Sequence, residues 1–236
     1  MNSEHPVRAA TVALLATANT YRGRPFGAAA QKLGLQVRWG VDLPAPLAAE
    51  WNVALALDFR DSEQAVRALT ALAQREPLAA VIALDDAATV IAAEAAARLG
   101  LAHNSPSAAL AARDKLIMRE RLRAGGARSP AFSAFPMDAD ASKIAARCGY
   151  PCVLKPLLLN GSRGVIRADN AAEFESAWRR VCAILRKSVG THILVEDYIP
   201  GREVAVEALL GENGLRPLAI FDKPDPLEGP FFEETI

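Results

Sequence analysis

The order of apolar and polar positions in the first part of the chain alternates between two periods. Short apolar runs that end at polar residues or glycine indicate buried β-strands, and apolar residues spaced three or four apart indicate helices. The expected strands are Thr11–Ala16, Leu35–Trp39, Val53–Leu57 and Ala79–Leu84. The expected helices are Phe26–Leu33, Asp61–Arg75 and Ala87–Leu99. Strands that alternate with helices in this way predict βαβ units and a parallel sheet.

Local signals mark the ends of these elements. Asp61 is placed to cap a helix, with Gln64 as its partner three residues on, and Gly34 is placed to end one. A proline-rich connection that contains Pro44 and Pro46 is expected between two of the strands.

The pattern changes at Ser105, an expected N-cap followed by Pro106, and we place a domain boundary there. The two expected domains are 1–104 and 105–236. The second contains expected helices at 107–112, 114–123 and 140–147 and from Asn170, strands at 131–135, 150–156 and from His192, and a hairpin at 203–222. Asn170 and Glu173 form an expected capping box.

The charge balance excludes several classes of partner. Lys plus Arg and Asp plus Glu number 27 each in 236 residues, which gives no support for binding nucleic acid or an anionic membrane. No apolar run reaches transmembrane length. The stretch after Arg8 has one feature of a secretion signal, but Glu4 and its short apolar core favour a first strand in a cytoplasmic protein.

The three cysteines, Cys148, Cys152 and Cys182, predict buried thiols without a disulfide framework.

A lysine followed by a glycine-bearing turn is the first candidate site. Lys155 lies near the end of an apolar strand, and Gly161-Ser162-Arg163-Gly164-Val165 follows within a loop's reach. A cation beside free backbone N–H groups suits a phosphate. Taken singly, the lysine fits a solvated strand end and Asn160-Gly161 fits a common hairpin turn. Together with Glu196, they favour phosphate binding.

Acidic and aromatic residues at the end of a strand are the second candidate. Glu196-Asp197-Tyr198-Ile199 suits a purine, which needs hydrogen bonds along its edge and a flat apolar wall. Glu196 is alternatively an edge-strand charge, and Tyr198 and Ile199 are alternatively core residues. Glu203 is either a surface charge or an acceptor for ribose hydroxyls.

Three further charged groups have simpler interpretations. Lys115 at a helix start fits a solvated turn unless the other segments bind a nucleotide. Asp85 and Asp86 most simply cap a helix, and Arg22 and Arg24 most simply are solvated loop charges. A role of these four at a substrate site is the weaker alternative. We find no Ser-His-Asp set, Walker pattern or zinc spacing.

In order and spacing, these segments resemble the ATP-grasp enzymes, in the carboxylate–amine ligase branch with amino-acid ligases, biotin carboxylase and carbamoyl-phosphate synthase. The resemblance rests on Arg113-Asp114-Lys115, the strand with Lys155, the loop 161–165, the segment 195–199 and Gly201-Arg202-Glu203. It covers nearly the whole chain. It implies an α/β and α+β fold: a Rossmann-like pre-ATP-grasp domain followed by an incomplete ATP-grasp domain.

The resemblance also implies roles for these residues. Lys115 and Lys155 would contact the phosphates or adenine of ATP, and the loop Gly161–Val165 would fold over the phosphates. Glu196 and the backbone at Asp197 and Tyr198 would hold the adenine edge, with Ile199 beside it, and Glu203 would hold the ribose. The implied chemistry is ligation: a small carboxylate attacks the γ-phosphate to form an acyl phosphate, and an amine then displaces phosphate.

One departure from the family pattern affects this interpretation. The family's Mg²⁺ ligands, a late glutamate and a Glu-x-Asn pattern, are expected beyond residue 236, and Glu233 and Glu234 come too early to be assigned to them. We therefore expect a fragment of a longer ligase. The alternatives are an enzyme like biotin carboxylase or carbamoyl-phosphate synthase, and a non-catalytic ATP-binding module. The sequence does not determine the oligomeric state, and a homodimer is one of the states compatible with it.

Overall fold

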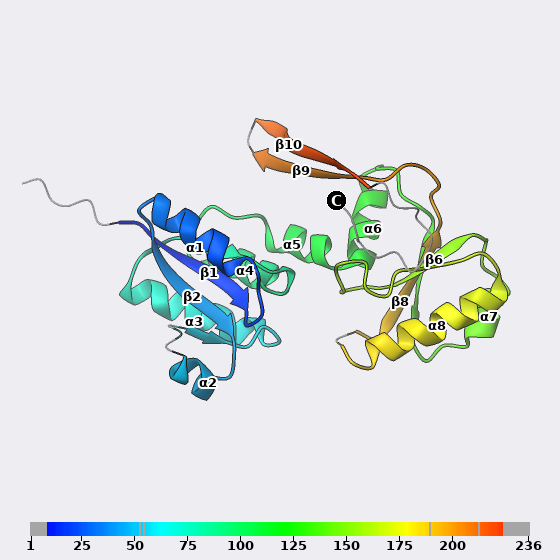
Figure 1. Ribbon diagram of the computed structural model, residues 1–236, viewed down its shortest axis with the longest axis horizontal. Coiled ribbons are helices and arrows are strands. Elements are labelled where there is room, and N and C mark those ends of the chain that lie inside the picture. The colour runs from blue at the N-terminus through cyan, green and yellow to red at the C-terminus, as the bar shows by residue number, and fades with distance from the viewer. Residues whose placement is uncertain (1–8, 52, 54, 189, 212, 224–236) are drawn as a thin grey trace, which may run out of the picture. The chain divides into compact units, whose positions relative to one another are not determined.

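The computed structural model describes residues 9–51, 53, 55–188, 190–211 and 213–223. The chain divides into two compact units that meet in sequence between Arg113 and Asp114 (Figure 1). The helix α5 (Pro106–Arg113), which follows the boundary expected at Ser105, therefore falls in the first unit.

The first unit is built on a parallel sheet, as the sequence predicted. Its strands are β1 (Thr11–Thr17), β2 (Gln36–Asp42), β3 (Leu55–Leu57) and β4 (Leu78–Ala83), in the order β3-β2-β1-β4. The helices are α1 (Gly23–Lys32), α2 (Ala45–Glu50), α3 (Ser62–Arg75) and α4 (Thr89–Arg98), with a 3₁₀ turn, η1, at Asp86–Ala88. Because β1 is central and buried on both faces, its sequence is an uninterrupted apolar run.

Alternate residues of β1 belong to two cores. Leu15 packs in one core with residues of α3 and α4, among them Leu69 and Ile91. Leu14 packs in the other core with Trp39 of β2. A Cβ on Gly27 of α1 would lie 3.5 Å from the Trp39 ring, so α1 approaches the sheet closely at this point.

Two local signals of the first unit are confirmed. The Asp61 side chain accepts from the Gln64 N–H at 2.9 Å, and Gly34 after α1 has a φ of 66°. The expected proline-rich connection at Pro44 and Pro46 joins β2 to β3, and it contains a helix, α2, that the sequence did not predict. Pro44 occupies the N-cap position and Pro46 the first turn, where a helix needs no N–H donor.

The second unit contains an antiparallel sheet. Its strands are β5 (Phe132–Pro136), β6 (Cys152–Pro156), β7 (Ile166–Ala168) and β8 (His192–Asp197), in the order β5-β8-β6-β7. The helices are α6 (Lys115–Ala124), α7 (Ala141–Ala145) and α8 (Ala171–Leu185). One half of the expected capping box at the start of α8 is present, since Asn170 accepts from the Glu173 N–H at 3.0 Å; Glu173 reaches back to the Asp169 N–H at 2.8 Å, one residue before the N-cap.

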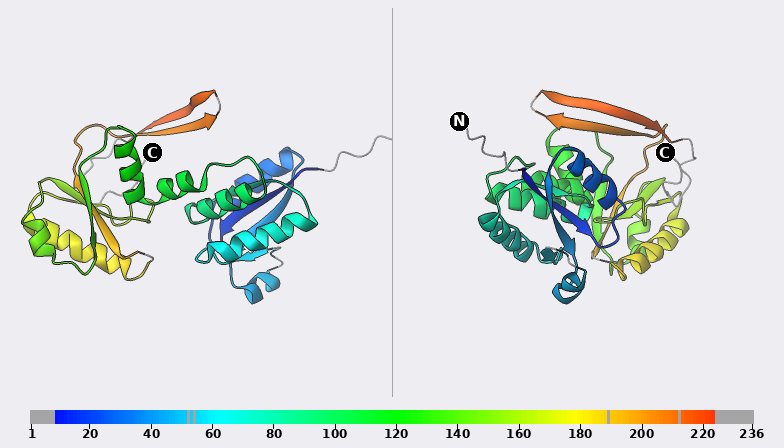
Figure 2. Two further views of the ribbon diagram at one scale, coloured as in Figure 1. Left: turned by 180° about the vertical axis from the view of Figure 1, so that it is seen from behind. Right: turned by 60° about the vertical axis from the view of Figure 1, so that its left-hand side comes forward.

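The two faces of this sheet differ in character because side chains alternate along a strand. The helix face carries Cys152, Leu154, Ile193 and Val195, which form one core with α8. The other face, here called the polar face, carries Lys155, Arg167 and Glu196 together with Phe132. Figure 2 shows α6 and α8 on opposite sides of the sheet.

A separate two-stranded hairpin follows. It consists of β9 (Val204–Gly211) and β10 (Gly214–Asp222), which confirms the predicted hairpin.

The core of the second unit depends on an aromatic pair on α8. The Phe174 ring is fully buried and stacks on Trp178 with centroids 5.9 Å apart. We expect Phe174→Ala to lower the free energy of unfolding by about 3–5 kcal/mol, because it leaves a cavity in a closed core. Urea unfolding followed by circular dichroism measures this. Phe221→Ala, at a ring that is 38% exposed, is the control and should lose much less; equal losses would contradict the expectation.

Candidate functional site

The polar face brings together the two charged residues that the sequence singled out. Val153 of β6 and Phe132 of β5 both lie opposite Glu196 of β8. Lys155 is two residues beyond Val153 and therefore projects to the same face as Glu196. The two side chains form a direct ion pair.

A third residue completes this cluster. Arg119 of α6 donates from Nε to Glu196 Oε2 at 2.9 Å and from Nη2 to Oε1 at 3.2 Å, while Lys155 contacts Oε1. The Glu196 side chain is only 5% exposed. Burial raises the pKa of Glu196, but the hydrogen bond from Arg119 and the charge of Lys155 outweigh it and hold that pKa below its usual range. Glu196 is therefore a buried carboxylate kept ionised by two cations.

The interpretation of Glu196 as an edge-strand charge is wrong, because β8 lies between β5 and β6. Arg119 was not among the residues predicted from the sequence. Its one signal was helical spacing, since Lys115 and Arg119 are four residues apart and share a side of the helix.

Lys115 joins the polar face to the glycine-bearing loop. Its Nζ donates to the carbonyl oxygens of Leu157, at 3.2 Å, and Leu159, and its backbone N–H also donates to Leu157. Lys115 is therefore part of the base of this loop, and the interpretation as a solvated turn charge is wrong.

The glycine-bearing loop is a tight turn with three residues in left-handed backbone conformations. Gly161, Ser162 and Gly164 have positive φ values of 58°, 48° and 80°. A Cβ on Gly164 would lie 3.0 Å from Cγ of Pro156, so that position requires glycine. The Arg163 N–H donates to Asn160 at 3.3 Å and the Val165 N–H to Ser162 at 3.0 Å, which makes a compact turn.

At the end of β8, the backbone N–H groups of Asp197 and Tyr198 donate hydrogen bonds within the protein, and that of Ile199 does not do so among the described residues. Asp197 N–H donates to Ala131 O at 3.0 Å and Tyr198 N–H to Pro151 O at 3.2 Å. No partner for the Ile199 N–H occurs among the described residues, and the Ile199 side chain is 63% exposed rather than in the core. The Arg167 guanidinium lies over the Tyr198 ring, 4.3 Å from the ring centroid, in a cation–π contact.

Glu203 lies at the base of the hairpin and forms an ion pair with Lys223. Arg202 and Asp222 make a second pair beside it, with a hydrogen bond of 2.5 Å. Glu203 keeps substantial exposure, so its carboxylate also faces solvent.

In the first unit, the Asp85 carboxylate accepts several hydrogen bonds at the carboxyl ends of β1 and β4. Its Oδ2 accepts from Thr17 N at 2.8 Å and Thr17 Oγ1 at 3.0 Å, and its Oδ1 from Thr20 Oγ1 at 2.9 Å. Arg22 lies 3.4 Å from Oδ1. The predicted capping role of Asp85 is therefore wrong, since its side chain holds the loop after β1 rather than a helix end. Burial raises the pKa of Asp85, but these donors outweigh it and lower that pKa.

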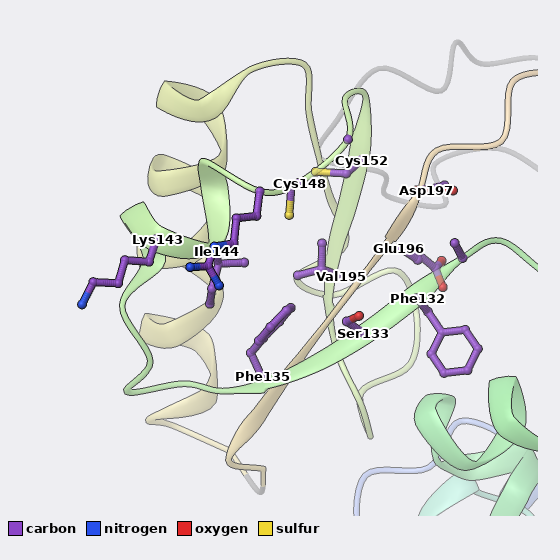
Figure 3. Close-up of a pocket in the computed structure, with 13 residues that line it drawn as sticks. Phe132, Ser133, Phe135, Lys143, Ile144, Cys148, Cys152, Val195, Glu196 and Asp197 are labelled. Atoms are coloured by element: carbon purple, nitrogen blue, oxygen red, sulfur yellow. The ribbon is translucent and has the colours of Figure 1, made fainter.

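A cavity of about 420 Å³ lies beside the edge strand β5, and its lining includes residues of the helix face such as Cys152 and Val195 as well as Phe132 and Glu196. Figure 3 shows Phe135, Cys148, Cys152 and Val195 around it, with Phe132 turned away. Burial raises the pKa of the Cys148 thiol, and it raises that of Cys152 to about 12. The thiols are free, as predicted, and both stay protonated near neutral pH.

Within the described residues, no helix is long and apolar enough to span a membrane. The same part of the chain contains no group of three or more His, Cys, Asp or Glu that could hold a metal ion. Glu233 and Glu234 lie outside the described residues.

Two family models match the chain in succession. One described as the ATP-grasp N-terminal domain matches residues 26–103, and one described as the ATP-grasp domain matches residues 148–236. The chain belongs to the ATP-grasp superfamily. The resemblance found in the sequence is thereby confirmed, together with the α/β and α+β fold class.

Relatives within the ATP-grasp superfamily include known ligases. The D-alanine–D-alanine ligase of Stutzerimonas stutzeri is 30% identical over 101 residues, which are 43% of this chain and 31% of the relative. The structure of L-amino acid ligase from Bacillus licheniformis superimposes with a TM-score of 0.73 and 25% identity over 95% of this chain and 53% of that one. N5-carboxyaminoimidazole synthetase from Staphylococcus aureus, complexed with ADP, shares the fold with a TM-score of 0.63 and 18% identity, over 92% of this chain and 55% of its own. The chain thus spans about half or less of the length of these relatives.

The ATP-grasp domain should depend on the charge of Glu196 for stability. The pKa of Glu196 is lower in the folded protein than the value of 4.5 that it has in the unfolded chain. Its ionised form therefore stabilises the fold above pH 4.5, and this stabilisation is lost as the pH falls through the pKa of the folded protein. We expect Glu196→Gln to lower the free energy of unfolding at pH 7 by up to about 3–5 kcal/mol, because it leaves two cations unpaired. The difference from wild type should shrink as the pH falls below 4.5.

Urea unfolding at neutral and acid pH measures this difference. Glu207→Gln, at an exposed position of β9, is the control and should follow wild type at every pH. A Glu196→Gln deficit that stayed constant with pH would show that the carboxylate charge is not responsible.

Proposed function

We propose that this chain is the ATP-binding part of an ATP-dependent ligase that activates a small carboxylate for attack by an amine. The observation that carries the proposal is the ion cluster of Arg119, Lys155 and Glu196 on the polar face, beside the glycine-bearing loop. The superfamily membership and the amino-acid ligases among the relatives support amino acids as the substrate class. No observation favours the carboxylase or the non-catalytic alternative over it.

The cluster supplies what a nucleoside triphosphate needs. Lys155 and Lys115 would provide positive charge for the phosphates, and the loop 161–165 would provide backbone N–H groups above them. The loop's positive φ values at Gly161, Ser162 and Gly164 support that role, since successive N–H groups in such turns form anion-binding concavities.

The end of β8 would hold the base. Glu196 would accept from the 6-amino group of adenine. Because the Asp197 and Tyr198 N–H groups already donate within the protein, the Ile199 N–H would be the donor to a ring nitrogen, and its exposed side chain would cover the ring. Glu203 would accept from the ribose hydroxyls in place of one contact to Lys223.

In the proposed reaction, the carboxylate oxygen attacks the γ-phosphorus and ADP leaves, which gives an acyl phosphate. The amine then attacks the acyl carbon, and phosphate leaves with the formation of the amide. Mg²⁺ would neutralise triphosphate charge when bound, and we assign none of the described residues to it.

Lys155 tests the phosphate contact. We expect Lys155→Ala to weaken ATP binding by about tenfold or more, since a charge-assisted hydrogen bond is lost. Isothermal titration calorimetry on the 236-residue chain measures the dissociation constant. Lys143→Ala is the control, because that lysine is 78% exposed on α7. Unchanged affinity in Lys155→Ala would overturn the assignment of the polar face as the phosphate site.

Glu203 tests the ribose contact. We expect Glu203→Gln to weaken binding of ATP more than binding of 2′,3′-dideoxy-ATP, because the analogue lacks both hydroxyls. Glu207→Gln in the neighbouring strand β9 controls for loss of a carboxylate on the hairpin. Equal losses for the two nucleotides would remove the ribose role from Glu203.

Ligation is tested by phosphate release. The enzyme, mixed with ATP and pairs of amino acids, should release phosphate and form a dipeptide detectable by mass spectrometry. ATP binding with no amino-acid-dependent phosphate release would reject the proposed amino-acid substrates.

A further inference from the structure

Arg119 fixes the orientation of the Glu196 carboxylate in addition to neutralising its charge. Its guanidinium binds both oxygens of Glu196, at 2.9 Å and 3.2 Å, and its own side chain is only 18% exposed. A planar guanidinium that binds a carboxylate at two points fixes the plane of that carboxylate as well as its charge.

We propose that Arg119 sets the base preference of the nucleotide site: by keeping Glu196 ionised and oriented, it makes the site select a 6-amino purine over a 6-oxo purine. This inference rests on the proposed function and adds to it a positioning residue that acts through Glu196.

The chemistry of the two purine classes provides the first step. An ionised carboxylate only accepts hydrogen bonds, whereas a protonated one also donates. The 6-amino group of adenine donates, and the 6-oxo group of hypoxanthine accepts. An ionised Glu196 therefore pairs with adenine and repels hypoxanthine, while a neutral Glu196 accommodates both.

The distribution of contacts on Glu196 provides the second step. Oε1 is shared by Arg119 and Lys155, whereas Oε2 accepts one hydrogen bond, from Arg119, among the described residues. A carboxylate oxygen has two lone pairs, so Oε2 retains acceptor capacity for an amino group.

Nucleotide binding changes which cations contact Glu196. The charged groups that contact Glu196 in the described part of the chain are Arg119 from α6 and Lys155 from β6. Phe132 lies opposite it on β5, and Arg167 of β7 pairs with Asp169 and Tyr198 instead. In the proposed complex Lys155 turns to the phosphates, which leaves Arg119 as the cation that keeps the buried carboxylate charged.

The experiment compares ATP with ITP, which differ at position 6 of the purine. Calorimetry on the 236-residue chain gives both dissociation constants for wild type, Arg119→Met, Arg119→Lys and Arg121→Met. Arg121 is the matched control, because it is an exposed arginine on the same helix.

We expect wild type and Arg121→Met to prefer ATP. In Arg119→Met the ratio of ITP to ATP dissociation constants should fall by about tenfold, the effect of one hydrogen bond to a charged group. Arg119→Lys should recover part of this ratio, because it restores the charge without the planar fork.

A purely structural role for Arg119 would weaken ATP and ITP equally and leave the ratio unchanged, which overturns the inference. Equal affinity of wild type for the two nucleotides also overturns it and leaves the proposed function intact. Failure of wild type to bind either nucleotide overturns the proposed function and the inference with it. If Arg119→Met does not fold, Arg119→Lys decides, because it keeps a cation at this position and removes the planar fork: a lowered ratio supports the inference, and a ratio equal to that of wild type overturns it.

Discussion

The second unit depends on how one buried carboxylate is kept charged. Glu196 lies in a central strand with almost no exposure, and an ionised group in such a place is costly unless it is paired and hydrogen-bonded. Arg119 and Lys155 meet this requirement from two other elements, so the cluster ties α6 and β6 to β8. The same arrangement concentrates positive charge beside a glycine-bearing loop with three positive φ values, which is the basis of the proposed nucleotide site.

The cluster exists because the sheet of the second unit has two different faces. The alternation of side chains puts Leu154 and Val195 into the core with α8 and puts Lys155 and Glu196 on the opposite side. One face therefore provides stability through close packing, and the other is free to carry charge. The cavity with Cys148 and Cys152 lies beside β5, and its protonated thiols give it no evident chemistry.

The two units hold their key acidic residues in contrasting ways. Both oxygens of Asp85 accept two contacts each, mainly from Thr17 and Thr20, so this carboxylate is saturated and serves to fix a loop. Glu196 instead is held by long cationic side chains, and its Oε2 keeps spare acceptor capacity. A carboxylate held by the flexible side chains of lysine and arginine is able to exchange a partner for a ligand, whereas Asp85 has both oxygens occupied by the loop that it fixes.

The sequence by itself determined the parallel sheet, the caps at Asp61 and Asn170, the hairpin and the family, because periodicity, capping and motif order are local or linear properties. It also indicated Lys155 and Glu196, but not that they touch. Only the tertiary structure showed Arg119 on Glu196, Lys115 at the base of the glycine-bearing loop, and Asp85 bound to Thr17 rather than capping a helix. These contacts join residues far apart in the chain, and no local pattern encodes which distant partner a charged side chain will meet.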